Sequence, residues 1–239
     1  MSTKNKIAIT VVLLGLLGSI YFVYEFLKPK GIEVSRKSFE VQGIDISFHC
    51  GKIDFAELNK GDIDFILMKS SEGTRYVDPR FREYYRKASQ YSWPIGFYHF
   101  FRFNKPGKQQ AIHFWNLVKD KEYQLPLAID VEEWGNDTKI PVSRVVKNVQ
   151  EFIHYIEKKT GKEILIYSNE NTYKRYLRKK FGNKPVWICS FYSKRVNRYP
   201  WKFWQFSHKG KVRGVKNLVD LNAFNGNRKQ WKQYLKQWD

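Results

Sequence analysis

The chain has 239 residues, 42% hydrophobic and 17% aromatic, a composition that excludes a disordered chain and predicts one main domain with a sizeable core. Lysine and arginine number 43 against 23 acidic residues, so the net charge is +20 at pH 7 and the surface should attract nucleic acid, anionic lipid or anionic cell-wall polymer. The two cysteines, Cys50 and Cys189, exclude a disulfide framework and show no zinc-site spacing, so we expect two unpaired thiols, with a single disulfide bridge between them as the alternative.

The N-terminal 31 residues contain an uncharged stretch, Ile7 to Tyr24, with lysines on both sides. A helix of this length spans roughly 27 Å, which is close to the thickness of the hydrocarbon core of a bilayer. We therefore predict a membrane anchor or signal segment over residues 1–31, followed by a basic linker over residues 32–41. The lack of a small-residue cleavage site favours an uncleaved transmembrane helix over a cleaved signal, and the lysines on both flanks leave its orientation open.

From residue 42 onward, short apolar runs of strand length alternate with longer segments of helical periodicity. The first six predicted strands span residues 43–48, 64–70, 94–101, 126–132, 163–169 and 186–192. The helices predicted between them span residues 79–91, 109–120, 142–160 and 170–181. The helix over 142–160 has the clearest one-sided apolar stripe and is closed by Gly161. Alternation of this kind predicts parallel pairing.

The C-terminal part of the chain departs from this alternation. Residues 201–207 and 218–224 are also typical of strands, but the connections before them are too short for a crossover helix. The eight strands match a full eightfold barrel, but the domain has only about five covering helices, and its length of about 200 residues is below the roughly 250 residues typical of such a barrel. We therefore predict the α/β class, as a modified TIM-like barrel over residues 42–239, with a basic C-terminal helix over residues 227–238.

Acidic residues stand on three of the predicted strands. Asp130 and Glu132 are two apart at the C-terminal end of their strand, so their side chains point to one face, where barrels carry catalytic groups. Asp45 lies in the first strand and Asp220 in the last, and these strands are neighbours in a closed barrel. A single aspartate at a strand end more often caps a helix or accepts a backbone hydrogen bond, but this combination predicts one acidic mouth. Like charges in one pocket raise at least one pKa, so a carboxyl can stay protonated near neutral pH and serve as a general acid.

Aromatic and polar side chains accompany these acids at the predicted strand ends. Sugar rings present apolar C–H faces that stack on aromatic side chains, and their hydroxyl and acetamido groups need hydrogen-bonding partners. We therefore predict a sugar-binding groove with contacts from Tyr98, Phe100, Tyr167, Trp187, Trp204, Gln205 and Lys69.

Eight motifs, taken in chain order, resemble glycoside hydrolase family 25, the lysozymes of the Chalaropsis and phage endolysin type. The motifs are GIDIS (43–47), KSSEGTRYVDPRF (69–81), GFYHF (96–100), PLAIDVE (126–132), IYSN (166–169), VWICSFY (186–192), FWQFS (203–207) and GVKNLVDLNAFNG (214–226). Together they cover essentially all of residues 42–226. The chain departs from the family at Cys50, where a polar residue is expected, and at Cys189, where a small residue is usual.

The resemblance implies a barrel of five βα units followed by three strands. It also implies hydrolysis, with retention, of the β-1,4 bond between N-acetylmuramic acid and N-acetylglucosamine in peptidoglycan. Glu132 matches the general acid, Asp130 the carboxylate beside it, and Asp45 and Asp220 the other acids of the site. Tyr98, Tyr167 and Gln205 match pocket positions. The nucleophile is either a carboxylate or the 2-acetamido oxygen of the substrate.

Several expectations about partners follow from this interpretation. No metal or organic cofactor is expected, and a monomer is expected. The positive surface would hold the protein against anionic envelope polymer, and the catalytic domain would act outside the cytoplasm, either anchored in the membrane or secreted. A catalytically silent wall-binding module is the alternative, which the complete set of acids disfavours. Nucleic-acid binding is not expected, because no recognised motif is present and the acids would be left unexplained.

Overall fold

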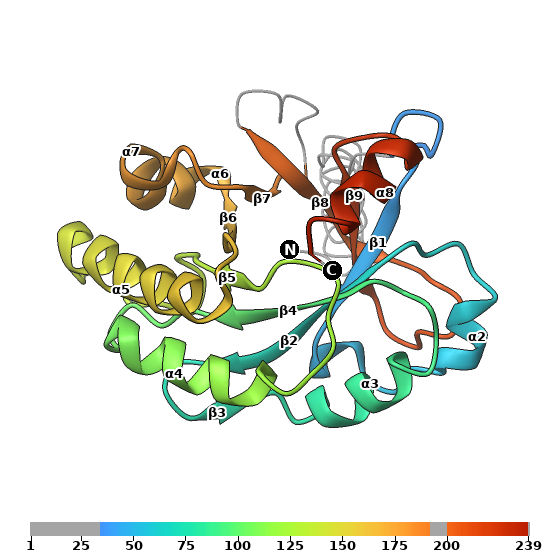
Figure 1. Ribbon diagram of the computed structural model, residues 1–239, viewed down its shortest axis with the longest axis horizontal. Coiled ribbons are helices and arrows are strands. Elements are labelled where there is room, and N and C mark those ends of the chain that lie inside the picture. The colour runs from blue at the N-terminus through green and yellow to red at the C-terminus, as the bar shows by residue number, and fades with distance from the viewer. Residues whose placement is uncertain (1–33, 192–199, 239) are drawn as a thin grey trace, which may run out of the picture. The chain divides into compact units, whose positions relative to one another are not determined.

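The computed structural model describes residues 34–191 and 200–238 (Figure 1). The chain divides into two compact units, residues 1–31 and residues 32–239, and the fold given below is that of the second unit. The anchor or signal segment predicted over residues 1–31 lies outside the described residues. Among the described residues, no helix has both the length and the apolar character needed to cross a membrane.

Eight strands of the second unit close into a barrel, as predicted. They are β1 (Gln42–Ile46), β2 (Ile66–Glu72), β4 (Ile95–Phe100), β5 (Ala128–Asp130), β6 (Leu165–Asn169), β7 (Val186–Cys189), β8 (Trp201–Gly210) and β9 (Val219–Phe224). Pairing is parallel from β1 through β2, β4, β5, β6 and β7 to β8. The ring is closed by β9, which runs antiparallel to both β8 and β1. A short strand not predicted from the sequence, β3 (Tyr76–Val77), extends β2 antiparallel at the edge.

Helices cover the outside of the barrel between β2 and β7 (Figure 1). They are α3 (Phe81–Ala88), α4 (Gly107–Val118), α5 (Val142–Thr160) and a final helical stretch made of α6 (Glu170–Thr172), the π-helical segment η2 (Tyr173–Leu177) and α7 (Arg178–Phe181). The long helix α5 has the predicted bounds, with Gly161 in the left-handed conformation at its end. Two short helical segments, η1 (Phe48–Cys50) and α2 (Phe55–Asn59), lie between β1 and β2 and were not predicted.

Close packing of α4 against α5 depends on a glycine. A Cβ atom at Gly107 would overlap the backbone carbonyl of Asn148 on α5. Because backbone atoms cannot move aside as a flexible side chain can, only glycine lets the start of α4 approach α5 this closely. This contact fixes the loop after β4, which forms one side of the barrel mouth.

The barrel wall separates two apolar layers, because successive side chains of a strand point to opposite faces. On β8, Phe203 belongs to the inner layer, while Trp204 and Phe206 belong to the layer outside the strands. Inner positions nearer the N-terminal ends of the parallel strands are apolar, such as Leu67 and Leu165, whereas those at the other end carry the polar groups. The strands therefore direct polar side chains to one mouth of the barrel.

The helix α8 (Arg228–Leu235) closes the opposite end of the barrel. Its start is stabilised by a capping box, in which Asn227 and Gln230 exchange hydrogen bonds between side chain and backbone. The ring of Trp231 lies 5.4 Å from that of Phe65 and 4.9 Å from that of Phe224, measured between centroids. The predicted basic C-terminal helix is thus present, and its aromatic face seals the barrel floor.

The segment predicted as a linker is described from residue 34 onward and packs on the barrel. Arg36 forms ion pairs with Asp62 and Asp64, at 2.5 and 2.6 Å. The ring of Phe39 lies 5.8 Å from Trp201 and 5.6 Å from Trp204. Residues 34–41 are therefore held to the domain rather than extending from it.

Candidate active site

All four predicted acids line one cavity of about 710 Å³ at the mouth of the barrel, where the parallel strands end. Of the predicted sugar contacts, six line the same cavity: Lys69, Tyr98, Phe100, Tyr167, Trp187 and Gln205. The structure thus brings together residues that are separated by up to about 175 positions in the sequence. Cavities of this size, with polar groups converging on apolar walls, are typical of small-molecule and polymer-binding sites.

The strands place each acid at the mouth in a different way. Asp130 is the last residue of β5, paired in register with Phe100 and Tyr167 on the neighbouring strands, and Glu132 follows two residues later. Asp45 is paired directly with Asp220 across β1 and β9. Because β9 runs antiparallel, Asp220 reaches the mouth from near the start of its strand, whereas Asp130 does so from the C-terminal end of β5.

A chain of hydrogen bonds orients Asp45. Its Oδ2 accepts from Asn222 Nδ2 at 2.7 Å and from Gln205 Nε2 at 2.9 Å. The Tyr167 hydroxyl donates to Gln205 Oε1 at 2.8 Å, and Trp187 Nε1 donates to Asn222 Oδ1 at 2.7 Å. Three residues predicted as sugar contacts therefore also hold Asp45 in one position, and both direct donors reach the same carboxylate oxygen, where they stabilise the negative charge.

Burial raises the pKa of every acid in the cavity. Burial raises the pKa of Asp45 to about 6, and the hydrogen bonds from Asn222 and Gln205 limit this rise. Burial and then the charge of Asp45 raise the pKa of Glu132 to about 7, and that of Asp220 to about 8. Burial, followed by the charge of Glu132, holds the pKa of Asp130 well above its usual value. Near neutral pH, Asp45 is therefore ionised first, while Glu132 keeps much of its proton.

Asp130 carries an unsatisfied oxygen. The residue is 6% exposed, and its Oδ1 has no hydrogen-bond partner among the described residues. Buried polar atoms are nearly always paired, so an exception in a cavity marks a place where a ligand donor would bind. A carboxyl oxygen in this position can accept a hydrogen bond from an N–H or O–H group of a bound ligand.

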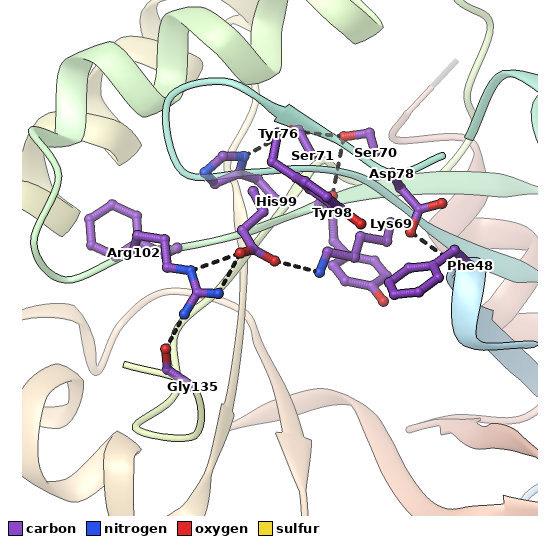
Figure 2. Close-up of polar contacts among 12 residues, drawn as sticks. Phe48, Lys69, Ser70, Ser71, Tyr76, Asp78, Tyr98, His99, Arg102 and Gly135 are labelled. Carbon is purple, nitrogen blue, oxygen red and sulfur yellow. Dashed lines mark hydrogen bonds and ion pairs between the residues drawn. The ribbon is translucent and has the colours of Figure 1, made fainter. Parts of the chain in front are cut away.

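Lys69 is held at the edge of the cavity by a network that Figure 2 shows. Its Nζ donates to Glu72 Oε2 at 2.9 Å, and Arg102 Nε donates to Glu72 Oε1 at 2.8 Å. Arg102 also donates to the carbonyl of Gly135, in the loop that follows Glu132. The positive charge of Lys69 lowers the pKa values of Asp130 and Glu132, and so counteracts part of the effect of burial.

Trp204 does not belong to the site, which corrects the prediction of a sugar contact there. It is 1% exposed, and its Nε1 donates to the carbonyl of Ser190 at 2.9 Å. Its neighbours on β8, Phe203 and Gln205, point into the barrel, so Trp204 must point outward, where its ring lies 5.6 Å from that of Phe39.

Trp134 is the main site residue that sequence reasoning missed. It lines the cavity, is 71% exposed, and its ring stands perpendicular to that of Phe100 at 6.2 Å. The signal that could have identified it is its position directly after the acidic strand end, in the sequence EEW. An exposed tryptophan beside a row of carboxyls provides the stacking surface that a sugar ring needs.

The two cysteines are unpaired, as predicted, and both line the cavity. Burial raises the pKa of Cys50 to about 12 and also raises that of Cys189, so neither is a thiolate near neutral pH. Among residues 34–191 and 200–238, no group of three or more histidine, cysteine or acidic side chains is arranged to hold a metal ion.

Comparison with known proteins agrees with this geometry. The family model for glycosyl hydrolases family 25 matches residues 44–215. The uncharacterised protein YegX of Escherichia coli O6:H1 is 30% identical over 213 residues, which are 86% of this chain and 77% of YegX. The autolytic lysozyme of Clostridium acetobutylicum is 29% identical over 185 residues, which are 77% of this chain and 56% of the lysozyme. A solved family 25 glycosyl hydrolase from Bacillus anthracis superposes with a TM-score of 0.77 at 31% identity, covering 85% of this chain and 96% of that one. The chain therefore belongs to glycosyl hydrolase family 25.

Proposed function

We propose that this glycosidase is a lysozyme that cleaves peptidoglycan between N-acetylmuramic acid and N-acetylglucosamine, with retention of configuration. The observation that carries the proposal is the single cavity in which the four carboxyl groups converge, with Asp45 fixed by hydrogen bonds and the pKa of Glu132 raised by burial to about 7. A relative named as an autolytic lysozyme supports the same substrate class.

In this mechanism, Glu132 acts first as an acid and then as a base. Its carboxyl proton passes to the glycosidic oxygen while the bond between that oxygen and C1 breaks. The resulting carboxylate later removes a proton from water as the water attacks C1. Asp45, fixed by Gln205 and Asn222, supplies negative charge that stabilises the positive charge developing on the sugar ring.

The 2-acetamido group of the substrate is the nucleophile that best fits the site. Its carbonyl oxygen attacks C1 to form a cyclic intermediate, and its N–H donates to the free Oδ1 of Asp130. Attack by this group and then by water inverts C1 twice, which gives retention. Glycan whose muramic acid lacks the N-acetyl group is therefore expected to resist cleavage, whereas direct attack by an enzyme carboxylate would leave it a substrate.

Analysis of released muropeptides by mass spectrometry tests the proposed reaction. Digestion of purified sacculi should give fragments with N-acetylmuramic acid at the reducing end, and NMR at early times should show that end as the β anomer. Fragments ending in N-acetylglucosamine would contradict the cleavage site. Binding to sacculi without release of fragments would favour the silent wall-binding module instead.

The proposed substrate also places the catalytic domain outside the cytoplasm. Peptidoglycan lies there, and residues 1–31 have the composition of an anchor or an export signal. The net charge of +20 favours contact with anionic envelope polymers.

A further inference from the structure

A second groove, of about 880 Å³, lies beside the proposed active site. It is formed by the turn between β2 and β3, the loop after β4, the loop after β5 and the first turn of α5. Four basic residues line it: Arg75, Arg102, Lys105 and Arg144. The proposed mechanism uses none of them.

The groove carries positive charge that the protein does not neutralise. Of its two acids, Glu72 is engaged by Lys69 and Arg102, and Asp137 accepts a hydrogen bond from a backbone amide within its own loop. Within the described part of the chain, the side chains of Arg75, Lys105 and Arg144 take part in no ion pair, and all three are exposed. The helix α4, whose N-terminus carries a partial positive charge, begins at Gly107, two residues after Lys105.

The groove and the active-site cavity share a wall. Phe100 lines the cavity, and the guanidinium of Arg102, which lines the groove, lies 4.9 Å from its ring. Glu72 joins Lys69, which lines the cavity, to Arg102, which lines the groove. In the next loop, Trp134 lines the cavity and Gly135 lines the groove. A ligand that extends past this wall would meet both surfaces.

We propose that this groove binds the carboxylates of the peptide attached to the glycan strand that is being cut. The inference rests on the proposed function and specifies its substrate further. In peptidoglycan, each peptide is joined to the lactyl group of N-acetylmuramic acid and carries free carboxylates. A glycan strand lying in the cavity therefore brings anionic groups to its edge, and arginine side chains bind carboxylates through paired hydrogen bonds.

The experiment compares three substrates prepared from the same sacculi: strands with intact peptides, strands whose peptide carboxylates are amidated, and bare strands from which an amidase has removed the peptides. The test variant is R75Q/R144Q, which leaves Arg102 in place because Arg102 also holds Glu72 and Gly135. The matched control is K232Q/K236Q, which removes the same charge from exposed positions at α8, on the opposite end of the barrel.

The wild-type protein should cleave intact strands with a higher kcat/KM than amidated or bare strands. For R75Q/R144Q, we expect kcat/KM on intact strands to fall about three- to tenfold through KM, with no change on the other two substrates. The control should match the wild type on all three, and added salt should reduce the wild-type preference for intact strands.

Three results would overturn the inference: an equal loss on all three substrates, no loss on intact strands, or the same loss in the control. Binding of polyglycerol phosphate that depends on Arg75 and Arg144, without any dependence on the peptides, would assign the groove to a phosphodiester polymer and also overturn it. Failure of the wild-type protein to cleave any of the substrates would instead refute the proposed function, so the two failures are distinguishable.

Discussion

The Glu132→Gln variant is expected to lose about 10²–10⁴-fold in its rate of hydrolysis of purified sacculi. Glutamine keeps the size and most of the polarity of the side chain, but it has no proton to give to the glycosidic oxygen and cannot later serve as a base. The release of soluble muropeptides, followed under conditions where the wild-type rate is linear, measures this loss. Near-normal turnover would rule out Glu132 as the acid.

The same variant should remain folded, and its stability should depend on pH in a defined way. The pKa of Glu132 is about 7 in the folded state against 4.5 for the free group, so the folded state binds a proton that the unfolded state has lost between these values. This carboxyl therefore makes the wild-type protein less stable as pH rises from about 4.5 to 7. Glutamine does not titrate, so Glu132→Gln lacks this loss of stability. The free energy of unfolding of the variant minus that of the wild type should therefore increase as pH rises through this range. Urea unfolding at pH 4.5 and 8 measures the difference.

Replacement of Trp231 by alanine is expected to destabilise the fold by about 3–5 kcal/mol. The indole is 6% exposed, and its ring packs against Phe65, Phe203 and Phe224 to close the barrel floor. Its removal leaves a cavity where eight strands meet, and the rigid strands around that cavity cannot collapse to fill it. Equilibrium unfolding in urea gives the change in free energy.

Lys232→Ala is the matched control for Trp231→Ala, because the neighbouring lysine is exposed on the same helix. A surface change of this kind usually stays within about 0.5 kcal/mol. If the two variants lost equal stability, α8 would stabilise the barrel only through its helical backbone and not by packing Trp231 into the end of the barrel. Trp231→Ala should also keep its activity wherever it remains folded, because the active site lies at the other end of the barrel.

Much of the fold could be predicted from the sequence, because the apolar runs and helical stripes follow the two periods that strands and helices impose. The direction of β9 could not be predicted. The connections before β8 and β9 are both too short for a crossover helix, yet β8 runs parallel to β7 while β9 runs antiparallel to β8 and β1, so connection length alone does not fix strand direction. The two-residue strand β3 and the short helix α2 are too brief to produce a periodic signal.

The acids were predictable because carboxyls are unusual beside apolar strand runs, and their convergence follows from barrel closure. Trp204 was misassigned because residues 201–206 contain four aromatic side chains and no clear alternation, so the sequence does not show which face each one takes. The basic groove was not predicted, since Arg75, Lys105 and Arg144 lie in three separate segments: the turn between β2 and β3, the loop after β4 and the first turn of α5. Only the folded barrel brings these segments to one edge.

The most direct test of the central claim is a titration of Glu132 itself, followed by NMR in protein carrying ¹³C in its glutamate carboxyl groups, with Glu132→Gln used to assign the signal. The structure predicts a midpoint of about 7 and a lower midpoint in Asp45→Asn, because the charge of Asp45 helps to raise this pKa. A midpoint near 4.5, unchanged in Asp45→Asn, would show that the acids do not share one buried site and would contradict the proposed mechanism.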